Sequence, residues 1–413
     1  MNVLVGIAAL EALAIVGGAV ETLEGAQLPD ATVLIKDGRI EKVVPGRVTP
    51  AGARVIEAAG RIVTPGFIAA DTALGLVEIS LEPTAHDQSV ESTPPDPNRA
   101  AFRAVDSLNT RSVLIPVQRL EGITSAIAAP EGGLVSGQSV FFDLVDGGRT
   151  DALVRAPLAI HVNLGAAGGM AVGGSRGWAI THLREILDDT RTYQRTRAQY
   201  DRNQSRPLAG SRLDLEALGL VIQGRVPLAV RVDREADILA TLDLAREQHI
   251  RVVILGGAEA WKVASVLARE RVPVLVQPMG NVPAGFDALG SRLDNAALLR
   301  RAGVAVGLSA GGEAHNVRTL RQQAGVAVSY GLPHEDGLRA LSRTIAEAFG
   351  VEKDYGTLAP GKVANVVVWT GDPLELSSQV TNVIVRGKEL PLRSRQTELR
   401  ERYRNLDGML PRP

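Results

Sequence analysis

Hydrophobic residues in the first sixty positions occur in short runs separated by residues that favour turns. One such run is Ala31 to Ile35, which is followed by Asp37-Gly38 and then by a second run, Ile40 to Val44. An Asp-Gly pair between two apolar runs is a strong hairpin signal, because both residues tolerate positive φ. Further short runs surround Gly60. The pattern predicts a small antiparallel β module at the start of the chain.

The middle of the chain alternates between helical spacing and short continuous apolar runs. Such alternation indicates βα units whose parallel strands are buried on both faces. Earlier apolar runs bring the number of candidate strands close to eight, so we predict an α/β fold with a distorted TIM (β/α)8 barrel. The expected strands are 67–68, 125–127, 158–162, 228–232, 251–255, 272–277 and 304–308, and the expected helices are 238–248, 260–269 and 295–302.

The β pattern returns near the C-terminus. Asn365 to Trp369 and Val383 to Val385 are apolar runs that flank the turn Gly371-Asp372-Pro373. Because β segments at both ends surround a parallel α/β body, we predict that the two ends pair into one small β-sandwich. The predicted domains are a composite β-sandwich from residues 1–64 and 356–392, a barrel from 65–355, and a charged C-terminal tail from 393–413.

Charge and composition narrow the classes of partner. The 45 Lys and Arg residues nearly balance the 46 Asp and Glu residues, so the chain has no overall basic field and we expect no nucleic-acid partner. The Arg- and Tyr-rich stretch Thr190 to Arg212 keeps single-stranded nucleic acid open as an alternative, although such a run is more typical of a solvated helix. The chain has no Cys, which excludes disulfides, thiolate metal sites and cysteine nucleophiles.

An apolar stretch, Val3 to Val20, raises the question of targeting. Glu11 interrupts it, and a transmembrane helix of about 20 residues tolerates a central carboxylate badly, so we expect no membrane span. The first basic residue is Lys36, whereas a secretory signal begins with a basic region. A folded first strand is favoured and a shortened signal remains an alternative, which leaves the cytoplasm and the periplasm both open.

Three segments resemble the amidohydrolase superfamily, in the family's order along the chain. Thr64 to Ala73 (TPGFIAADTA) is similar to its entry strand, Gly356 to Asn365 (GTLAPGKVAN) to its return into the β domain, and Ile35 to Ile40 to its N-terminal hairpin. Glu259 to Ala264 and the turn Gly371 to Leu374 resemble the imidazolonepropionase-like branch. The resemblance implies a hydrolase of non-peptide carbon–nitrogen bonds that uses zinc or another divalent metal.

The positions that hold the metal in this family carry other residues here. By resemblance, these positions are Asp71 and Ala73 for a His-x-His pair, His161 for the bridging ligand, Arg231 and Gly256 for two further His, and Ala310 or Gly311 for a terminal Asp. A divalent ion needs three or more suitable ligands within about 2–2.5 Å, and the fixed positive charge of an arginine repels it. We therefore predict no metal or other cofactor and a catalytically degenerate chain, a pseudoenzyme.

We assign no catalytic residue and expect an ion pair at the barrel mouth instead. Strand-end side chains of a barrel point into one shared space, so Arg231 is expected to pair with Asp71 or Asp233, with room left for it by Gly256. The candidate residues at this mouth are Asp71, His161, Arg231, Asp233 and His315.

Two glycine motifs and two classes of function stay open. Gly307 to Gly311 matches the Gly-x-Ser-x-Gly nucleophile elbow around Ser309, and the backbone amides of the glycine-rich segment Gly165 to Gly177 are able to hold an anion. One class is the family's hydrolase activity, retained through an unusual site. The other is a non-catalytic subunit that binds a small molecule or supports an active amidohydrolase paralogue, as a homo-oligomer or hetero-oligomer.

Overall fold

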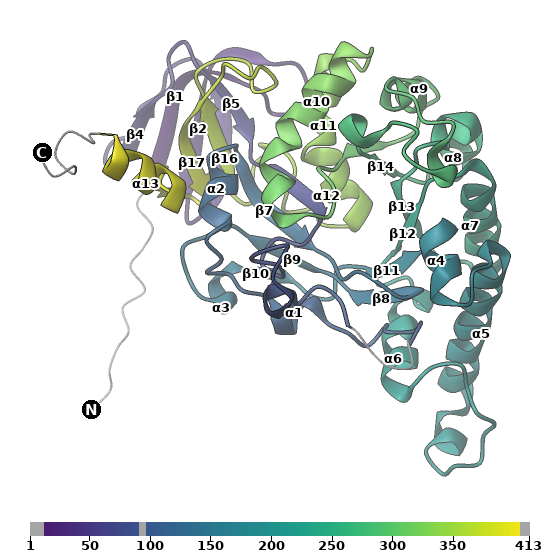
Figure 1. Ribbon diagram of the computed structural model, residues 1–413. Helices are drawn as coiled ribbons and strands as arrows, with labels where there is room; N and C mark the ends of the chain where they lie inside the picture. The colour runs from purple at the N-terminus through teal and green to yellow at the C-terminus, as the bar shows by residue number, and fades with distance from the viewer. Residues whose placement is uncertain (1–11, 91–95, 405–413) are drawn as a thin grey trace, which may run out of the picture.

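Strands from both ends of the chain form a single sheet in the computed structural model, which describes residues 12–90 and 96–404 (Figure 1). The strands of this composite sheet are β1 (Leu13–Val20), β2 (Leu28–Lys36), β3 (Arg39–Pro45), β4 (Arg54–Glu57), β5 (Ile62–Pro65), β16 (Val366–Trp369), β17 (Val380–Val385) and β18 (Lys388–Leu390). They lie in the order β18–β17–β16–β5–β1–β2–β3, with β4 also beside β1. The antiparallel pairing of β16 with β5, in which Val367 faces Thr64, joins the two ends of the chain.

The composite sheet is continuous from β18 to β3. Ile15 and Val33 share a core with Val366 and Ile384, although their strands are separated in the sheet order. The sheet therefore curls around its own core, and the start of β3 meets the chain near Val363. This curvature buries strands from both ends of the chain without a break in the hydrogen bonding, and the small β-sandwich expected from the sequence stays a prediction.

The N-terminal segment follows the predicted hairpin chemistry. β2 and β3 are joined at Asp37-Gly38, whose φ angles of 49° and 76° suit the twist of a two-residue turn. Residues 13–20 of the first apolar stretch form the buried strand β1, and residues 1–11 lie outside the described part of the chain. No helix within residues 12–90 and 96–404 has the length and apolar character needed to cross a membrane.

The central α/β body contains two further sheets. One has the order β10–β9–β7–β6 and the other β15–β14–β13–β12–β11–β8. β6 and β7 are parallel, as are β11 to β15, whereas β8 and β9 pair antiparallel with β11 and β7. The strands are β6 (Phe67–Thr72), β7 (Ile123–Ala128), β8 (Val135–Gln138), β9 (Val140–Asp143), β10 (Leu153–Arg155), β11 (Ile160–Asn163), β12 (Leu228–Val232), β13 (Val252–Gly256), β14 (Val274–Val276) and β15 (Val306–Leu308).

The closed barrel of the prediction is not seen as a continuous ladder. Single hydrogen bonds link the two sheets: the Ser139 amide donates to the Ala159 carbonyl at 3.0 Å, and Ser309 Oγ donates to the Ala70 carbonyl at 3.0 Å. The reason lies partly in β8 and β9, two consecutive strands that belong to different sheets and that the apolar runs do not predict. β9 pairs antiparallel with β7 and β8 pairs antiparallel with β11, where an ideal barrel would continue with parallel strands.

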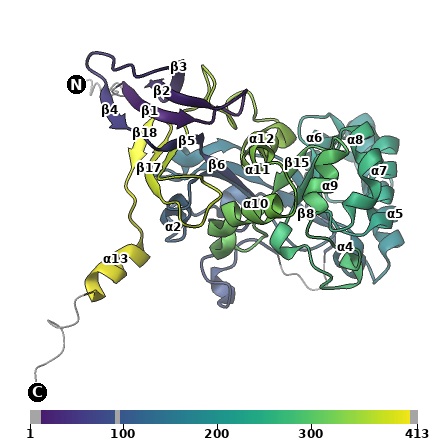
Figure 2. The same cartoon turned by 90° about the horizontal axis from the view of Figure 1, so that it is seen from above.

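Helices from the middle of the chain cover the side of the α/β body that is far from the composite sheet (Figure 2). The helices predicted from apolar spacing correspond to α7, to the 3-10 turn η2 with α8, and to α9. The α-helices are α1 (Ala104–Ser107), α2 (Ile115–Arg119), α3 (Arg149–Ala152), α4 (Gly165–Ala171), α5 (Arg176–Tyr200), α6 (Arg212–Ile222), α7 (Glu235–Gln248), α8 (Ala264–Glu270), α9 (Asn295–Arg301), α10 (Leu320–Ser329), α11 (His334–Ala340), α12 (Arg343–Phe349) and α13 (Arg395–Tyr403). The 3-10 turns are η1 (Pro83–Ala85), η2 (Ala260–Val263), η3 (Pro278–Gly280), η4 (Phe286–Ala288) and η5 (Ala314–Thr319).

The Arg- and Tyr-rich stretch forms the C-terminal part of α5, the following loop and the start of α6. Tyr193 is buried and donates to Glu216 Oε1 at 3.0 Å, and Arg197 and Arg212 contact the same oxygen at 3.2 and 3.0 Å. Arg206 pairs with the buried Asp189. These side chains hold α5 against α6 and the loop between them, which gives the stretch a structural role.

A buried polar network, here called the joint, connects the composite sheet to the α/β body. Asp143, at the end of β9, accepts hydrogen bonds from Ser125 Oγ at 2.7 Å, Asn365 Nδ2 at 2.9 Å and Tyr355 Oη at 3.0 Å. Arg386, in the β17–β18 turn, forms an ion pair with the same carboxylate. The joint fixes how the composite sheet sits on the α/β body, and so helps to position β6.

Candidate functional site

Asp71 stands near the end of β6 with an unusual backbone conformation. Its φ is +54°, in the left-handed region that residues other than glycine seldom adopt, although Asp tolerates it better than most. The pairing of β6 with β7 shifts register between Ala69 and Thr72, so Asp71 lies in a bulge. Strain of this kind costs about 1–3 kcal/mol and gathers at functional sites. The end of β6 is therefore a candidate functional position.

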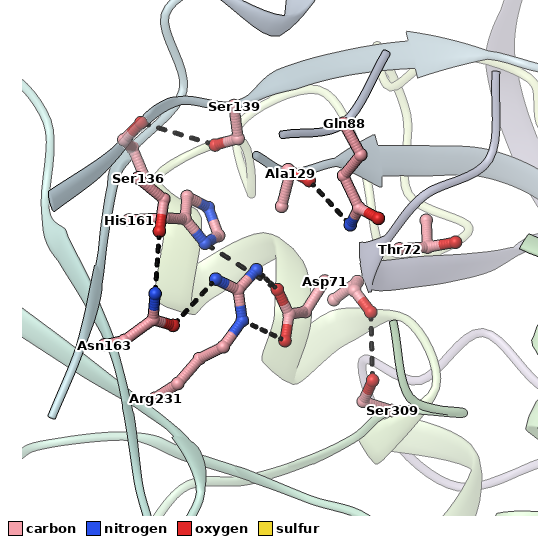
Figure 3. Close-up of polar contacts among 12 residues, drawn as sticks. Asp71, Thr72, Gln88, Ala129, Ser136, Ser139, His161, Asn163, Arg231 and Ser309 are labelled. Atoms are coloured by element: carbon pink, nitrogen blue, oxygen red, sulfur yellow. Dashed lines mark hydrogen bonds and ion pairs between the residues drawn. The ribbon is translucent and has the colours of Figure 1, made fainter. Parts of the chain in front are cut away.

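The guanidinium of Arg231, on β12, binds the carboxylate of Asp71 through two nitrogens (Figure 3). Arg231 Nε donates to Asp71 Oδ2 at 3.2 Å, while Nη2 donates to Oδ1. The remaining nitrogen, Nη1, lies 3.4 Å from Asn163 Oδ1 at the end of β11. Asn163 is held in turn, because its Nδ2 donates to the Gly133 carbonyl at 2.9 Å and to Ser136 Oγ at 3.0 Å. Three strand ends thus converge on one ion pair.

His161, also on β11, completes what we call the strand-end cluster of Asp71, His161, Asn163 and Arg231. Its side chain is fully buried, and its Nδ1 lies 3.7 Å from Asp71 Oδ1. Within residues 12–90 and 96–404, neither ring nitrogen has a hydrogen-bond partner. Burial, together with the positive charge of Arg231, lowers the pKa of His161 to about 3. The imidazole is therefore neutral at neutral pH, and its approach to Asp71 is not an ion pair under those conditions.

The electrostatics of the cluster are dominated by the arginine. Burial raises the pKa of Asp71, but the charge and hydrogen bonds of Arg231 outweigh burial and lower that pKa below its ordinary value. Burial lowers the pKa of Arg231, and Asp71 more than compensates, so the pKa of the guanidinium is raised. Both partners are therefore ionised across the neutral range. The pair is internally neutralised.

Asp233 does not share this ion pair, which corrects one part of the prediction. It follows the end of β12, and its Oδ1 accepts a hydrogen bond from the Ala258 amide at 3.0 Å. A Cβ atom at Gly256 would lie 2.5 Å from this oxygen, so the space at Gly256 admits Asp233 and not Arg231. Burial, with a smaller contribution from Asp287 and Glu259, raises the pKa of Asp233.

The other candidate positions at these strand ends contribute no titratable group to the cluster. Ala73 is buried and its amide donates to the Gly312 carbonyl, and a Cβ at Gly311 would meet Gln277 at 3.4 Å. Ala310, the alternative position for the terminal Asp, is half-buried and packs against the core. His315, on η5, is half-exposed and lies 3.3 Å from Glu313.

Ser309 does not have the surroundings of a nucleophile. Its side chain is buried, and its Oγ donates to the Ala70 carbonyl. The Gly311 amide donates to Ser309 Oγ at 3.2 Å. A nucleophile elbow places its serine on a strained turn beside a histidine. Ser309 is outside the left-handed region, and its bonds join the end of β15 to β6 instead.

The glycine-rich segment already holds an anion from its own chain. It forms α4 and the start of α5, and the Ala166 amide donates to Asp287 Oδ2 at 2.5 Å. Arg176 pairs with the same carboxylate. The anion that this segment binds is therefore Asp287, and the contact holds η4 against α4.

The donor set at the strand ends does not fit a divalent ion. Asp71 supplies the carboxylate and His161 the imidazole, but both oxygens of Asp71 are taken by a guanidinium whose charge repels a cation. Within residues 12–90 and 96–404, no group of three His, Asp or Glu side chains is arranged to hold a metal ion. No step of a reaction can be assigned to a metal from these residues.

Asn163 is the member of the cluster that sequence reasoning misses. It lies two residues beyond His161, so its side chain leaves the strand on the same face. That period-two relation to His161 is the signal that identifies it.

The chain is similar in sequence and in structure to known amidohydrolases. Residues 229–390 match the amidohydrolase family. An amidohydrolase from Thermotoga maritima MSB8 has a similar structure, with a TM-score of 0.84, 24% identity, and coverage of 92% of this chain and 100% of that one. A triazine hydrolase from Arthobacter aurescens has a TM-score of 0.55 and 18% identity, and covers 97% of this chain and 100% of its own. The chain therefore has the amidohydrolase fold.

A curated relative extends the likeness in sequence. Amidohydrolase tasK from Hapsidospora irregularis is 24% identical over 388 residues, which cover 86% of this chain. This chain spans about two fifths of the length of that relative, since the match covers 39% of it.

Proposed function

We propose that this chain is an amidohydrolase-type protein, of the class that hydrolyses non-peptide carbon–nitrogen bonds, whose own strand-end site does not support the metal-dependent reaction. The observation that carries the proposal is the bidentate ion pair between Arg231 and Asp71. The segment Glu259 to Ala264 and the turn at Gly371 to Leu374 support a place in the imidazolonepropionase-like branch.

The physical argument concerns the source of the nucleophile. A bound metal ion lowers the pKa of its water from about 16 to near 7 and so supplies hydroxide at neutral pH. Arg231 brings a positive charge to the same strand ends, but a guanidinium has only donors and no position for a coordinated water. Its charge is also neutralised by Asp71. On this proposal the chain binds a small molecule or supports an active paralogue.

Retained hydrolysis is the second candidate, and His161 favours it. A neutral imidazole has a free lone pair, and both ring nitrogens of His161 lack partners beside Asp71. On this reading the buried imidazole accepts a proton in a reaction that opens the cluster to substrate. The names of the triazine hydrolase and of amidohydrolase tasK agree with a hydrolytic role.

Metal analysis together with thermal melts separates the two candidates. We expect purified protein to contain no stoichiometric zinc, manganese or iron, and its melting temperature to be the same with and without a chelator. A panel of acyl amides and cyclic amides should remain unhydrolysed. Asp354→Ala is the matched control, since it removes an aspartate from an exposed pair with Arg39.

The opposite result has a definite form. About one tightly bound metal per chain, lost together with amide hydrolysis in Asp71→Ala but kept in Asp354→Ala, would establish the hydrolase and overturn the proposal. A large chelator-induced drop in melting temperature would show that metal, and not the ion pair, holds the strand ends together.

A further inference from the structure

A groove opens at the opposite end of the α/β body, where strands β12 to β15 begin. It encloses about 640 Å³, within the range of about 300–1,000 Å³ that is usual for small-molecule sites. Residues at the starts of these strands line it, and α7 and α12 supply its walls. Figure 1 places β12, β13 and β14 between these two helices. None of the residues that line the groove belongs to the strand-end cluster.

The floor of the groove is apolar. It consists of Ile250, Val252, Val272, Pro273 and Ala305, and the three aliphatic side chains Ile250, Val252 and Val272 are each less than a tenth exposed. Such a floor favours a hydrocarbon body, because covering its remaining surface removes apolar area from water.

The rim of the groove has an excess of positive charge. Both carboxylates that line it are occupied: Glu270 accepts from Arg246 at 2.8 Å, and Glu347 accepts from Arg343 at 2.8 Å. Arg251 and Arg271 line the same groove and are exposed, and among the described residues neither forms an ion pair. Within the described part of the chain, the side chain of Arg251 donates to the Gly224 carbonyl at 3.1 Å. Two arginines of the groove lining are thus without an acidic partner there.

Arg271 also occupies a position that ordinarily belongs to glycine. It follows α8 with φ +55°, the left-handed conformation of a helix C-cap. Residues with a side chain seldom adopt this conformation. An arginine is thus kept at a strained position on the rim.

We propose that this groove binds a small amphipathic carboxylate, with the carboxylate at Arg251 and Arg271 and the hydrocarbon body on the apolar floor. A guanidinium matches a carboxylate through two parallel hydrogen bonds, which an uncharged head group cannot accept in the same way. The ligand class is therefore a monocarboxylic acid with an aliphatic or aromatic body.

Calorimetric titration of the full chain with sodium octanoate tests the proposal. We expect saturable one-to-one binding. The affinity for octanol should be at least about ten-fold weaker, because it lacks the charge. The affinity for butyrate should also be at least about ten-fold weaker, because it lacks four methylene groups. In Arg251→Gln/Arg271→Gln the affinity for octanoate should fall by at least about ten-fold.

A second double variant controls for net charge. Arg111→Gln/Arg318→Gln removes the same charge from two exposed arginines that do not line the groove, and it should change octanoate affinity by less than about two-fold. Ala305→Phe places a ring over the floor without removing any charge, and it should abolish binding. Circular dichroism and melting temperature verify that each variant is folded. Absence of saturable octanoate binding to the wild type, or equal weakening in the two double variants, would overturn the proposal.

Discussion

The joint and the strand-end cluster are both built around a buried aspartate that faces an arginine, yet they differ in how fully their polar atoms are paired. Asp143 has a completely buried side chain and accepts hydrogen bonds from Ser125, Asn365, Tyr355 and Arg386. Asp71 is nearly as buried, but among the described residues its side-chain hydrogen bonds come from Arg231 alone, and both nitrogens of the adjacent His161 lack partners there.

The difference separates a structural network from a candidate site. A fully paired buried network stabilises one arrangement, whereas buried groups left without partners cost about 1–3 kcal/mol each and call for an explanation. The joint spans the interface between the composite sheet and the α/β body, which is an architectural task. The strand-end cluster lies at the carboxyl ends of parallel strands, the face on which barrel enzymes have their active sites, and within the described residues it has a strained aspartate and an unsatisfied imidazole.

Breaking the joint should have the largest effect. Asp143→Ala removes the acceptor shared by four side chains and leaves the Tyr355 hydroxyl and the Arg386 guanidinium without it. Loss of one partner from a buried charged pair costs about 3–5 kcal/mol, so we expect the free energy of unfolding to fall by that amount. Urea denaturation measures it. Tyr355→Phe, which deletes one hydrogen bond, should cost only about 1 kcal/mol, and equal losses in the two variants would contradict the network.

Breaking the strand-end ion pair should have a smaller effect. Arg231→His leaves Asp71 buried without its partner, but Arg231 is 21% exposed, so we expect a loss of about 2–3 kcal/mol. The change should not create metal-dependent hydrolysis, because Ala73, Gly256 and Gly311 still offer no ligand side chain. Melting curves and amide hydrolysis with added zinc measure both effects.

A nearby arginine and a double variant sharpen this second test. Arg234→His breaks a more exposed pair with Asp237 and should cost less than about 1 kcal/mol. Asp71→Asn/Arg231→Met removes both charges and should recover most of the stability lost in Arg231→His. Failure of the double variant to recover would mean that Arg231 stabilises the fold by packing and not through Asp71.

The neutral His161 predicts a pH dependence, the smallest of the three effects near neutrality. An unfolded imidazole has a pKa of about 6.5, whereas the pKa in the folded chain is lowered to about 3. Between these values the unfolded chain binds more protons, so the stability is complete above about pH 6.5 and is lost as the pH falls, by at most about 1.4 kcal/mol per unit. His161→Leu should reduce this slope in urea titrations at pH 4 to 7. Parallel slopes for the two proteins would contradict a buried neutral histidine.

Several elements of the α/β body are predictable because their apolar runs are buried on both faces. β12 has the predicted bounds, Leu228 to Val232, since four of its five side chains are buried and the run has no competing pattern. β8 and β9 are not predictable in this way. β8 reads Val-Ser-Gly-Gln, a weak strand sequence, and it is extended because β11 pairs with it.

In the candidate site, too, the residues at strand ends are predictable from the sequence, whereas their pairing depends on the tertiary structure. Asp71, His161 and Arg231 are identifiable from their places at strand ends, and the structure brings them together. Asp233 was assigned to the same cluster, but it lies one residue past the end of β12, where the chain turns toward Ala258. The choice between two aspartates for one arginine depends on the bulge at Asp71, which no residue pattern reveals.

The pairing of β5 with β16 has a consequence for how the chain is made. Pro65 and Val366 face each other across this ladder, and a ribosome adding about 5–20 residues per second needs roughly 15–60 s to synthesise what separates them. During that interval the apolar face of β1 and β5 emerges without the strands that will cover it, although Val20 and Val63 are fully buried in the finished protein. The early hairpins therefore expose apolar surface until the last part of the chain has been synthesised.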